Sequence, residues 1–513
     1  MTDMLNQLGC YDVVVIGGGI NGVGIAVDAA GRGLSVFLCE KDDLASHTSS
    51  ASSKLIHGGL RYLEHKEFRL VREALAEREV LLAKAPHLIR PMRFILPHRP
   101  HLRPAWLIRT GLFFYDFLGK REHLAGSKLL DFDPIAGPLK PEIKRGFEYS
   151  DCAVDDARLV VLSAVQAAEK AATIQTRTRF ISAKRELGFW SLQCENQQGV
   201  FQLQAKALVN AAGPWAVDVI KDQLQLSSPY SIRLIQGSHI VVPRIYSGEK
   251  AYILQNEDQR IVFAIPYLQD YTLIGTTDRE YHGDPNHVVI TAEEVDYLLN
   301  VTNAHFKIQL CADAIISSFS GLRPLCDDES DNPAAITRDY TLALSKGLPE
   351  EAPLLSVFGG KLTTYRKLAE AAMHELKPYF PRMTGSWTEK SALPGAEGLE
   401  GIADVEQLVL QLSQQISDLP ASLAQRWAHA YGTRIWLLLG GHVQRMEQLG
   451  QDFGHGLYAI EVEYLVAREW AVTSEDILWR RSKLGLKLKA NEIVALDIFL
   501  AELHRKRMQE YAA

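Results

Sequence analysis

The chain has 513 residues, more than one hydrophobic core usually organises, so we expect two or three globular domains. The 55 basic and 62 acidic residues give a net charge of −7, which argues against a general nucleic-acid-binding surface but leaves room for a local basic patch. The six cysteines form no CxxC pair, so we expect no zinc ribbon, no other metal site and no disulfide framework, as in a reducing cytoplasm.

The N-terminal segment predicts a strand, a glycine-rich turn and a helix of the kind that binds a dinucleotide. Residues 13–16 are apolar and β-branched, as in a strand buried on both faces of a parallel sheet, and a helix is expected over about residues 20–32. Gly17 suits a tight turn, Gly19 lets the backbone approach a pyrophosphate, and Gly22 lets the helix pack close to the strand. The phosphates would then lie at the positive end of the helix.

A second apolar strand, residues 35–39, ends at Glu40. An acid at this distance from the glycines is typical of a side chain that hydrogen-bonds a ribose hydroxyl and repels a 2′-phosphate, so the cofactor should be NAD or FAD rather than NADP. The chain contains no second strand–GxGxxG–helix pattern. We therefore expect one dinucleotide, with which the substrate reacts directly.

A basic and aromatic island lies between residues 87 and 121, after a scaffold helix expected at 66–84. The island holds seven Arg or Lys residues against one acid, Asp116, and its segment 104–118 predicts an apolar helix too short to cross a bilayer. Two interpretations stay open: a helix lying on an anionic membrane, and a buried helix whose arginines reach solvent. A second cationic stretch, residues 480–489, holds five Lys or Arg and no acid, and it too suggests a membrane surface or else an ordinary solvated face.

Further along the chain the pattern becomes β-rich and then helical. A buried strand over 207–210 ends in small residues, which allow a ligand to approach the backbone. Between 230 and 300, β-rich runs alternate with turn residues and predict an antiparallel sheet on the substrate side; amphipathic helices are expected at 405–415, 423–430, 460–470 and 493–508. No apolar run reaches about 18 residues and the first nine residues lack the features of a signal peptide, so neither a membrane span nor secretion is expected.

Three segments far apart in the sequence place polar side chains next to glycines: residues 49–62, 320–324 and 356–365. In the last of them an apolar strand runs into Gly359 and Gly360 and then into a helix start, where free backbone amides can stabilise negative charge on an acceptor such as a reduced flavin. Each segment taken alone also has a plain structural interpretation, as a turn or a surface ion pair.

With these segments in place, the chain closely resembles the FAD-dependent glycerol-3-phosphate dehydrogenases of bacterial respiratory membranes. The resemblance covers essentially the whole length and rests on the runs 15–22, 49–63, 140–149, 237–239, 275–278, 323–330, 358–367 and 479–481. It implies oxidation of sn-glycerol 3-phosphate to dihydroxyacetone phosphate by hydride transfer to FAD, with the electrons passed to a membrane quinone such as ubiquinone. It also implies a homodimer, attached to the anionic surface of the inner membrane on its cytoplasmic side, with no nucleic-acid partner.

The fold that the resemblance implies is α/β (α+β). It comprises a FAD-binding Rossmann-like domain of the glycine-oxidase type, an antiparallel β-rich substrate cap and a C-terminal all-helical domain. The expected divisions are 1–85, 150–228 and 318–385 for the FAD-binding domain, 86–149 and 229–317 for the cap, and 390–513 for the helical domain.

The resemblance also assigns site residues. It gives His57, Arg61, Arg323, Lys361 and, more weakly, His239 as active-site residues, and Arg61, Tyr62, Arg323 and Lys361 as substrate ligands. Contacts with FAD are expected from Gly17, Gly18, Gly19, Ile20, Asn21, Gly22, Glu40, Lys41, Ser49, Ser50, Lys54, Leu55, Ala212, Gly213, Gly360, Lys361, Leu362 and Thr363. Arginine suits a phosphate dianion because its planar fork binds two oxygens and stays charged.

Oxidation of a secondary alcohol requires the hydroxyl proton to leave as hydride departs from carbon. We hypothesise that His57, or less readily His239, takes this proton with the help of Arg323, while hydride goes to flavin N5; the rival interpretation is that His57 only hydrogen-bonds backbone near the flavin. Two other functions are kept as alternatives. One is an amino-acid or amine oxidase of the same superfamily, and the other is a non-catalytic or nucleic-acid-acting flavoprotein.

Overall fold

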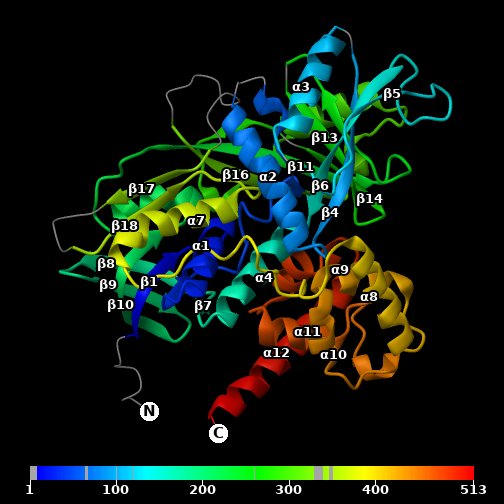
Figure 1. Ribbon diagram of the computed structural model, residues 1–513. Helices are drawn as coiled ribbons and strands as arrows, with labels where there is room; N and C mark the ends of the chain where they lie inside the picture. Colours follow the sequence, from blue (N-terminus) through cyan, green and yellow to red (C-terminus); the bar gives the residue numbers. More distant parts are fainter. Residues whose placement is uncertain are drawn as a thin grey trace.

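The first sheet of the computed structural model carries the N-terminal fingerprint at its centre (Figure 1). Its strands run in the order β17-β18-β10-β1-β2-β7, and the five from β18 to β7 are parallel. They are β1 (Gly9–Ile16), β2 (Val36–Cys39), β7 (Thr173–Gln175), β10 (Gly199–Asn210) and β18 (Leu354–Phe358), with β17 (Thr341–Ser345) and the hairpin β8 (Arg179–Arg185) and β9 (Trp190–Asn196) antiparallel beside them. The structure describes residues 9–63, 67–99, 101–119, 121–258, 260–275, 277–327, 339–345 and 351–512.

Both faces of this sheet are covered, which explains the unbroken apolar run at its centre. On one face, α1 (Ile20–Gly31) packs between α4 (Asp156–Glu169) and α7 (Tyr365–Leu376), over Val13 and Val15. On the other face, Val14 and Ile16 pack with the hairpin β8–β9. The strand and the helix expected around the glycines are therefore confirmed, with helix α1 beginning at residue 20 as predicted.

The second sheet is predominantly antiparallel and follows the order β15-β11-β14-β13-β12-β4-β6-β3, with β16 paired to β11 and β5 to β6. Its strands are β3 (Leu55–Ile56), β4 (Ile89–Pro97), β5 (Lys128–Asp131), β6 (Arg145–Val154), β11 (Ile232–Pro243), β12 (Ala251–Gln255), β13 (Ile261–Tyr267), β14 (Tyr271–Gly275), β15 (Arg279–Tyr281) and β16 (Ser317–Cys326). Among its described strands, one pair is parallel and joins β12 to β4. This is the expected β-rich cap.

Helices cover both faces of the cap sheet as well. α2 (Phe68–Lys84) and α3 (Ala105–Phe117) share a hydrophobic cluster with the face that contains Phe263, whereas α6 (Ala292–His305) covers the opposite face. In Figure 1, α3 lies at the end of the molecule remote from the C-terminal helices. Among the described residues, no helix is both long and apolar enough to cross a bilayer.

The sheets divide the chain differently from the expected domain limits. Residues 318–326, expected in the FAD-binding domain, belong to β16, which pairs with β11 from Ile232 opposite Cys326 to Val241 opposite Ser317. Residues 150–154 likewise continue β6 of the cap sheet. The strands that pair with them, β11 and β4, lie far away in sequence, so local composition does not reveal where they belong.

The C-terminal helices build a hydrophobic core of their own. They are α8 (Ile402–Gln415), α9 (Ala421–Tyr431), α10 (Ile435–Leu439), α11 (Ala459–Arg468) and α12 (Ala490–Ala512), and they enclose large side chains such as Trp427 and Tyr431. A remaining short helix, α5 (Ala216–Asp218), lies in the FAD-binding domain. Four of these C-terminal helices coincide with the expected amphipathic segments, so the helical domain is confirmed.

Buried ion pairs fasten the helical domain to the FAD-binding domain. Arg158 of α4 forms a salt bridge with Glu469, which follows α11, and both side chains are almost completely buried. The same guanidinium donates to the carbonyl oxygen of Ala430 at 3.1 and 2.8 Å. The domain contact therefore contains charges that are compensated only while the two parts are together.

The membrane interpretation of residues 480–489 is wrong for the arginines in this stretch. Arg480 and Arg481 are buried, and each donates to Asp43 of the FAD-binding domain at 2.6 Å. Lys483 is buried too, with its Nζ 3.5 Å from Asp155. These cations lie inside the domain contact because their acidic partners, hundreds of residues away in sequence, meet them there.

Candidate functional site

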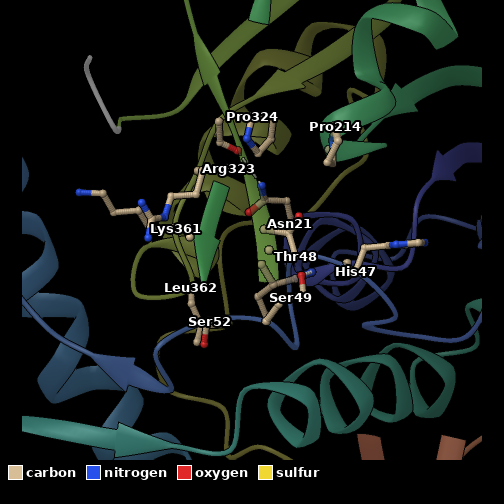
Figure 2. Close-up of a pocket in the computed structure, with 18 of the residues that line it drawn as sticks. Asn21, His47, Thr48, Ser49, Ser52, Pro214, Arg323, Pro324, Lys361 and Leu362 are labelled. Atoms are coloured by element: carbon tan, nitrogen blue, oxygen red, sulfur yellow. Dashed lines mark hydrogen bonds between the residues drawn. The ribbon is translucent and has the colours of Figure 1, made fainter. Parts of the chain in front are cut away.

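A cavity of about 620 Å³ runs between the two sheets and contains most of the expected site residues. Its walls come from the glycine turn after β1, the segment 45–60, the loop after β10, the cap sheet and the turn after β18. Figure 2 shows Arg323 and Lys361 together at one side of this space, and His47 and Pro214 at the other. Chain segments that are remote in sequence thus form one continuous pocket.

The glycine turn has the close approaches that the sequence predicts. Gly17 has a φ of +109°, in the region that favours glycine. A Cβ on Gly22 would lie 1.9 Å from the carbonyl oxygen of Gly17, so the helix could not approach the turn with any other residue there. Gly19, the N-cap of helix α1, provides no side-chain cap, but Ser49 Oγ accepts from the amide of Ile20 at 3.0 Å. The helix start therefore faces the cavity with polar backbone groups.

Glu40 lies beside this turn. Its carboxylate accepts from the amide of Gly18 at 2.6 Å and from the amide of Asp42 at 2.9 Å. Burial raises the pKa of Glu40, and these two amide hydrogen bonds counteract that rise. Each oxygen keeps a second lone pair, so the carboxylate can still accept from a ribose hydroxyl, as expected from the sequence.

The turn after β18 lies against the N-terminal fingerprint. Gly359 and Gly360 have φ values of +75° and +99°. The amide nitrogen of the Asn21 side chain donates to the carbonyl oxygen of Gly359 at 3.0 Å, and a Cβ on Gly360 would lie 2.7 Å from that nitrogen. Asn21 thus couples the glycine turn, expected to hold the pyrophosphate, to the segment expected to face the flavin.

The backbone beyond this turn meets the first polar segment. Thr363 Oγ1 accepts from the amide of His57 at 3.3 Å, and the His57 ring packs edge-on against Phe263, 6.3 Å between centroids. His57 and Lys361 both line the cavity and both have interactions within the protein. The first and third polar segments, which contain His57 and Lys361, therefore meet at the cavity.

Arg323 and His239 form the cap side of the same region. Arg323 on β16 forms an ion pair with Asp278. His239 on β11 is buried; its Nε2 lies 3.0 Å from Ser53 Oγ, and its ring stacks on Phe319. Burial, with Lys54 and Arg323 nearby, holds the pKa of His239 well below its usual value, so the ring is neutral at neutral pH.

Some expected contacts lie outside the cavity wall. Lys54 is buried, has a φ of +59°, and donates to Asp156 at 2.9 Å and to the carbonyl oxygen of Ser50 at 2.8 Å. Lys54 and Ser50 instead border a neighbouring cavity of about 370 Å³, and this placement favours a role in holding the loop rather than in touching a cofactor. Gly18 and Gly22 belong to the glycine turn but do not line the cavity. The backbone of Arg61 and Tyr62 lies in a short helical turn, Leu60–Leu63.

Several lining residues have no role in the sequence-based expectations. Asp278 and Ser53 hold Arg323 and His239, and Asn286 of the cap accepts from Lys41 Nζ at 2.7 Å. Asp278 ends one of the runs that carry the resemblance, which could have indicated it. The contact between Lys41 and Asn286 joins residues 245 positions apart, and no local pattern announces it.

These features fit FAD at both ends. The close glycine approaches and the accepting carboxylate of Glu40 suit an adenosine diphosphate, and the buried Asn21 Oδ1, which has no partner among the described residues, offers a further hydrogen bond beside it. The turn Gly359–Gly360 lies one hydrogen bond away, through Asn21. A two-ended ligand of FAD's kind therefore finds polar groups along the cavity.

Comparison with known protein families places the fold in a defined class. Residues 12–366 match the family model of FAD dependent oxidoreductases, and residues 386–505 match the C-terminal domain of alpha-glycerophosphate oxidase. A solved structure of the glycerol-3-phosphate dehydrogenase from Bacillus halodurans, complexed with FAD, is 26% identical with a TM-score of 0.73 and covers 99% of this chain and 92% of its own. Glycine oxidase from Geobacillus kaustophilus shares the fold alone, at 19% identity and a TM-score of 0.53 over 75% of this chain and 98% of its own. Fold and cavity thus define a flavoprotein oxidoreductase of the glycine-oxidase type.

Relatives of known name are similar over nearly the whole chain. Glycerol-3-phosphate dehydrogenase of Pseudomonas aeruginosa is 64% identical over 98% of this chain and 97% of its own length, and the aerobic enzyme of Escherichia coli is 56% identical over 97% and 98%. D-erythritol 1-phosphate dehydrogenase of Brucella abortus is 52% identical over 94% and 96%. The chain belongs to the FAD-dependent oxidoreductase family and, within it, to the glycerol-3-phosphate dehydrogenases.

Proposed function

We propose that this protein oxidises sn-glycerol 3-phosphate to dihydroxyacetone phosphate and delivers the electrons through FAD to a membrane quinone. The observation that carries the substrate assignment is the pairing of Arg323 and Lys361 at one side of the cavity, which His57 also lines. Two cations from separate segments suit a phosphate dianion, whereas the single carboxylate of an amino acid is usually met by one arginine. FAD, when bound, accepts hydride from the alcohol carbon.

Anaerobic addition of sn-glycerol 3-phosphate tests this assignment directly. The flavin absorbance should bleach, and an amino acid such as glycine should leave it unchanged. D-Erythritol 1-phosphate is the sharper comparison, because a relative that is 52% identical bears its name. Stronger bleaching by the four-carbon phosphate would replace the proposed substrate, and no bleaching by either would refute the proposal.

The role proposed for Arg323 and Lys361 is to bind the phosphate and hold the alcohol in place. Asp278 fixes the Arg323 guanidinium from the cap side, so that its remaining donors can point into the cavity. Arg323→Ala should raise the substrate concentration needed for half-maximal bleaching by at least tenfold, as expected when a charge-assisted pair is lost. Normal substrate affinity in this variant would remove Arg323 from the phosphate site.

For the proton of the substrate hydroxyl, we propose His57 rather than His239 as the acceptor. General bases work best when their pKa lies near the working pH, and the strongly lowered pKa of His239 makes that ring a poor match. His57 lines the cavity next to Thr363 and the flavin-side turn. His57→Asn should slow flavin reduction by two orders of magnitude or more at normal FAD content, by the usual contribution of a general base; unchanged reduction would leave His57 a purely structural role.

Attachment to a membrane surface is proposed through helix α3. Its side chains Trp106, Phe113 and Phe117 are 69%, 57% and 68% exposed, while Ile108 and Leu112 pack inward on the cap. Exposed aromatic side chains on one face, with arginines nearby, are typical of a helix that lies in a membrane interface. Of the two interpretations of this segment, exposure favours the interfacial helix.

Flotation with anionic liposomes at low salt tests this attachment. The wild-type protein should float, and the double variant Trp106→Asp and Phe117→Asp should stay in solution. Leu187→Asp is the matched control, because Leu187 is 73% exposed and lies on the β8–β9 hairpin of the other sheet. Equal flotation of all three proteins would rule out α3. A location on the cytoplasmic side and a homodimer remain predictions from the resemblance, and sedimentation equilibrium measures the latter.

A further inference from the structure

The backbone that carries His57 is held from two sides. The amide of Gly58 donates to the hydroxyl oxygen of Tyr115, on α3, at 2.8 Å in a buried hydrogen bond. From the other side, Thr363 accepts from the amide of His57. Two hydrogen bonds on consecutive amides thus fix the peptide from which the His57 side chain extends to line the cavity.

Glycine at position 58 permits the close approach to Tyr115. A Cβ there would lie 2.6 Å from Leu75 Cδ2 and 2.8 Å from the Tyr115 hydroxyl oxygen, so any other residue would push this segment away from α3. Gly58 does not line the cavity. The small residue at this position therefore serves the contact with Tyr115.

A buried ion pair orients the Tyr115 hydroxyl. The hydroxyl lies 2.8 Å from each carboxylate oxygen of Asp151, to which Arg78 donates at 2.7 Å. All three side chains are almost completely buried. Burial and the charge of Asp151 raise the pKa of Tyr115 well above its usual value, so the hydroxyl keeps its proton. Because a carboxylate only accepts, this proton points at Asp151 and leaves a lone pair of the oxygen for the Gly58 amide.

Tyr115 also supports the aromatic side chains that lead to the His57 ring. Its ring packs edge-on against Tyr149, with 5.5 Å between the centroids. From Tyr149 the ring contacts continue to Phe94 at 5.5 Å and from there to Phe263 at 6.3 Å. Phe263 packs edge-on against His57. The backbone and the ring of His57 are therefore both connected to Tyr115.

Packing alone does not account for this polar network. A phenylalanine at position 115 would fill nearly the same volume, and burying the charges of Arg78 and Asp151 costs free energy that apolar side chains would not cost. What the hydroxyl and the ion pair add is a fixed direction for one hydrogen bond, to the backbone next to His57.

We infer that Tyr115, oriented by Asp151 and Arg78, is a positioning residue for His57; the inference rests on the proposed function, in which His57 takes the proton of the substrate hydroxyl. Tyr115 does not line the cavity, and it neither gains nor loses a proton in the reaction. It keeps the imidazole within hydrogen-bond reach of the hydroxyl while hydride leaves the carbon that bears it. The rate depends steeply on this placement, since a displacement of about 1 Å can cost on the order of 100-fold.

Tyr115→Phe tests this role in the holoenzyme, because it keeps the ring and removes the hydroxyl. The rate constant for flavin reduction by sn-glycerol 3-phosphate, followed by stopped-flow absorbance, should fall about tenfold, the effect of one lost hydrogen bond. FAD content and the substrate concentration for half-maximal rate should stay as in wild type. Tyr246→Phe is the matched control: it removes a buried hydroxyl that donates to the carbonyl oxygen of Ala264 at 2.9 Å, in the cluster on the other face of the cap sheet. This control should reduce flavin at the wild-type rate.

Two further measurements separate positioning from a purely structural role. In the His57→Asn background, adding Tyr115→Phe should cause no further loss of rate, because no base remains to be positioned. Hydrogen–deuterium exchange needs no turnover, and it should be faster for peptides covering residues 55–60 in Tyr115→Phe. The same peptides should exchange as in wild type in Tyr246→Phe.

Three results would overturn the inference: wild-type flavin reduction in Tyr115→Phe, an equal loss of rate in the His57→Asn background, or unchanged exchange of residues 55–60. A loss of FAD or of substrate affinity in Tyr115→Phe would also overturn it, because Tyr115 would then support binding rather than His57. If the substrate fails to bleach wild-type flavin, the proposed function itself fails and the inference falls with it. Faster exchange in Tyr115→Phe would still be seen in that case, so the two failures can be told apart.

Discussion

Replacing Gly22 with alanine should weaken FAD binding while leaving the remainder of the protein folded. The added Cβ would lie 1.9 Å from the carbonyl oxygen of Gly17, and real Cβ atoms essentially never approach another heavy atom within 3.0 Å. Helix α1 or the turn must therefore retreat by at least about 1.1 Å. Overpacking of this kind costs about 1–3 kcal/mol. If the turn relieves the overlap by shifting, FAD must restore the original geometry when it binds, and its affinity falls by roughly 5-fold to 150-fold.

The assay is the ratio of flavin to protein absorbance after purification, followed by titration of the apoprotein with FAD. Gly111→Ala is the matched control, since a Cβ at Gly111 in α3 meets nothing within 4 Å and alanine favours helix there. The control should keep full FAD and equal or slightly higher stability. Tight stoichiometric FAD in Gly22→Ala would refute the argument that close approach at this glycine sets the geometry of the pyrophosphate end.

Three further predictions concern domain contact, pH and the cap carboxylate. Arg158→Met leaves Glu469 buried without its main partner and should lower the free energy of unfolding by about 3–5 kcal/mol. Adding Glu469→Leu should restore much of that loss. Urea unfolding measures both variants, and equal stability of the single variant and wild type would contradict the buried pair. Burial lowers the pKa of His87 to about 3, so the unfolded chain binds more protons and stability is lost as pH falls below about 6.5. Between pH 7 and pH 5, urea unfolding should show a loss of about 2 kcal/mol from His87 that is absent in His87→Leu. An identical pH dependence of the two proteins would refute this prediction. Asp278→Asn should weaken substrate binding several-fold by releasing Arg323, measured by the same bleaching titration, and unchanged affinity would show that Arg323 needs no such support.

Local sequence predicts those parts of the site that neighbours in the chain determine. The apolar run before Gly17 and the helix after it follow from residue order alone, because both faces of the strand are buried and the glycines permit the turn. The β-rich pattern predicts the cap sheet, and the amphipathic pattern of the C-terminal segments predicts the helical domain. The roles of His57, Arg323 and Lys361 came from resemblance, and the structure brings their segments into one cavity.

Other features depend on contacts between remote segments, and local patterns misjudge them. The run from Arg480 to Lys489 has the composition of a solvated surface, yet its arginines bind Asp43 inside the domain contact. Lys54, expected at the cofactor from the resemblance, pairs in the structure with Asp156, a residue 102 positions further along the chain. In both cases the sequence shows a charge and the fold decides its partner.

The ion pairs beneath the helical domain have a consequence for how this architecture could lose or gain that domain. Proteins such as glycine oxidase share the fold over 75% of this chain, a share that matches its two-sheet portion. In a chain trimmed back to that portion, Asp43 would lose Arg481, Arg158 would lose Glu469, and both charges would face solvent. The constraint acts instead on gain of the domain: any domain that docks here must bring an acidic partner for Arg158 and a basic partner for Asp43, because a charge buried in the contact without its partner would destabilise the assembly.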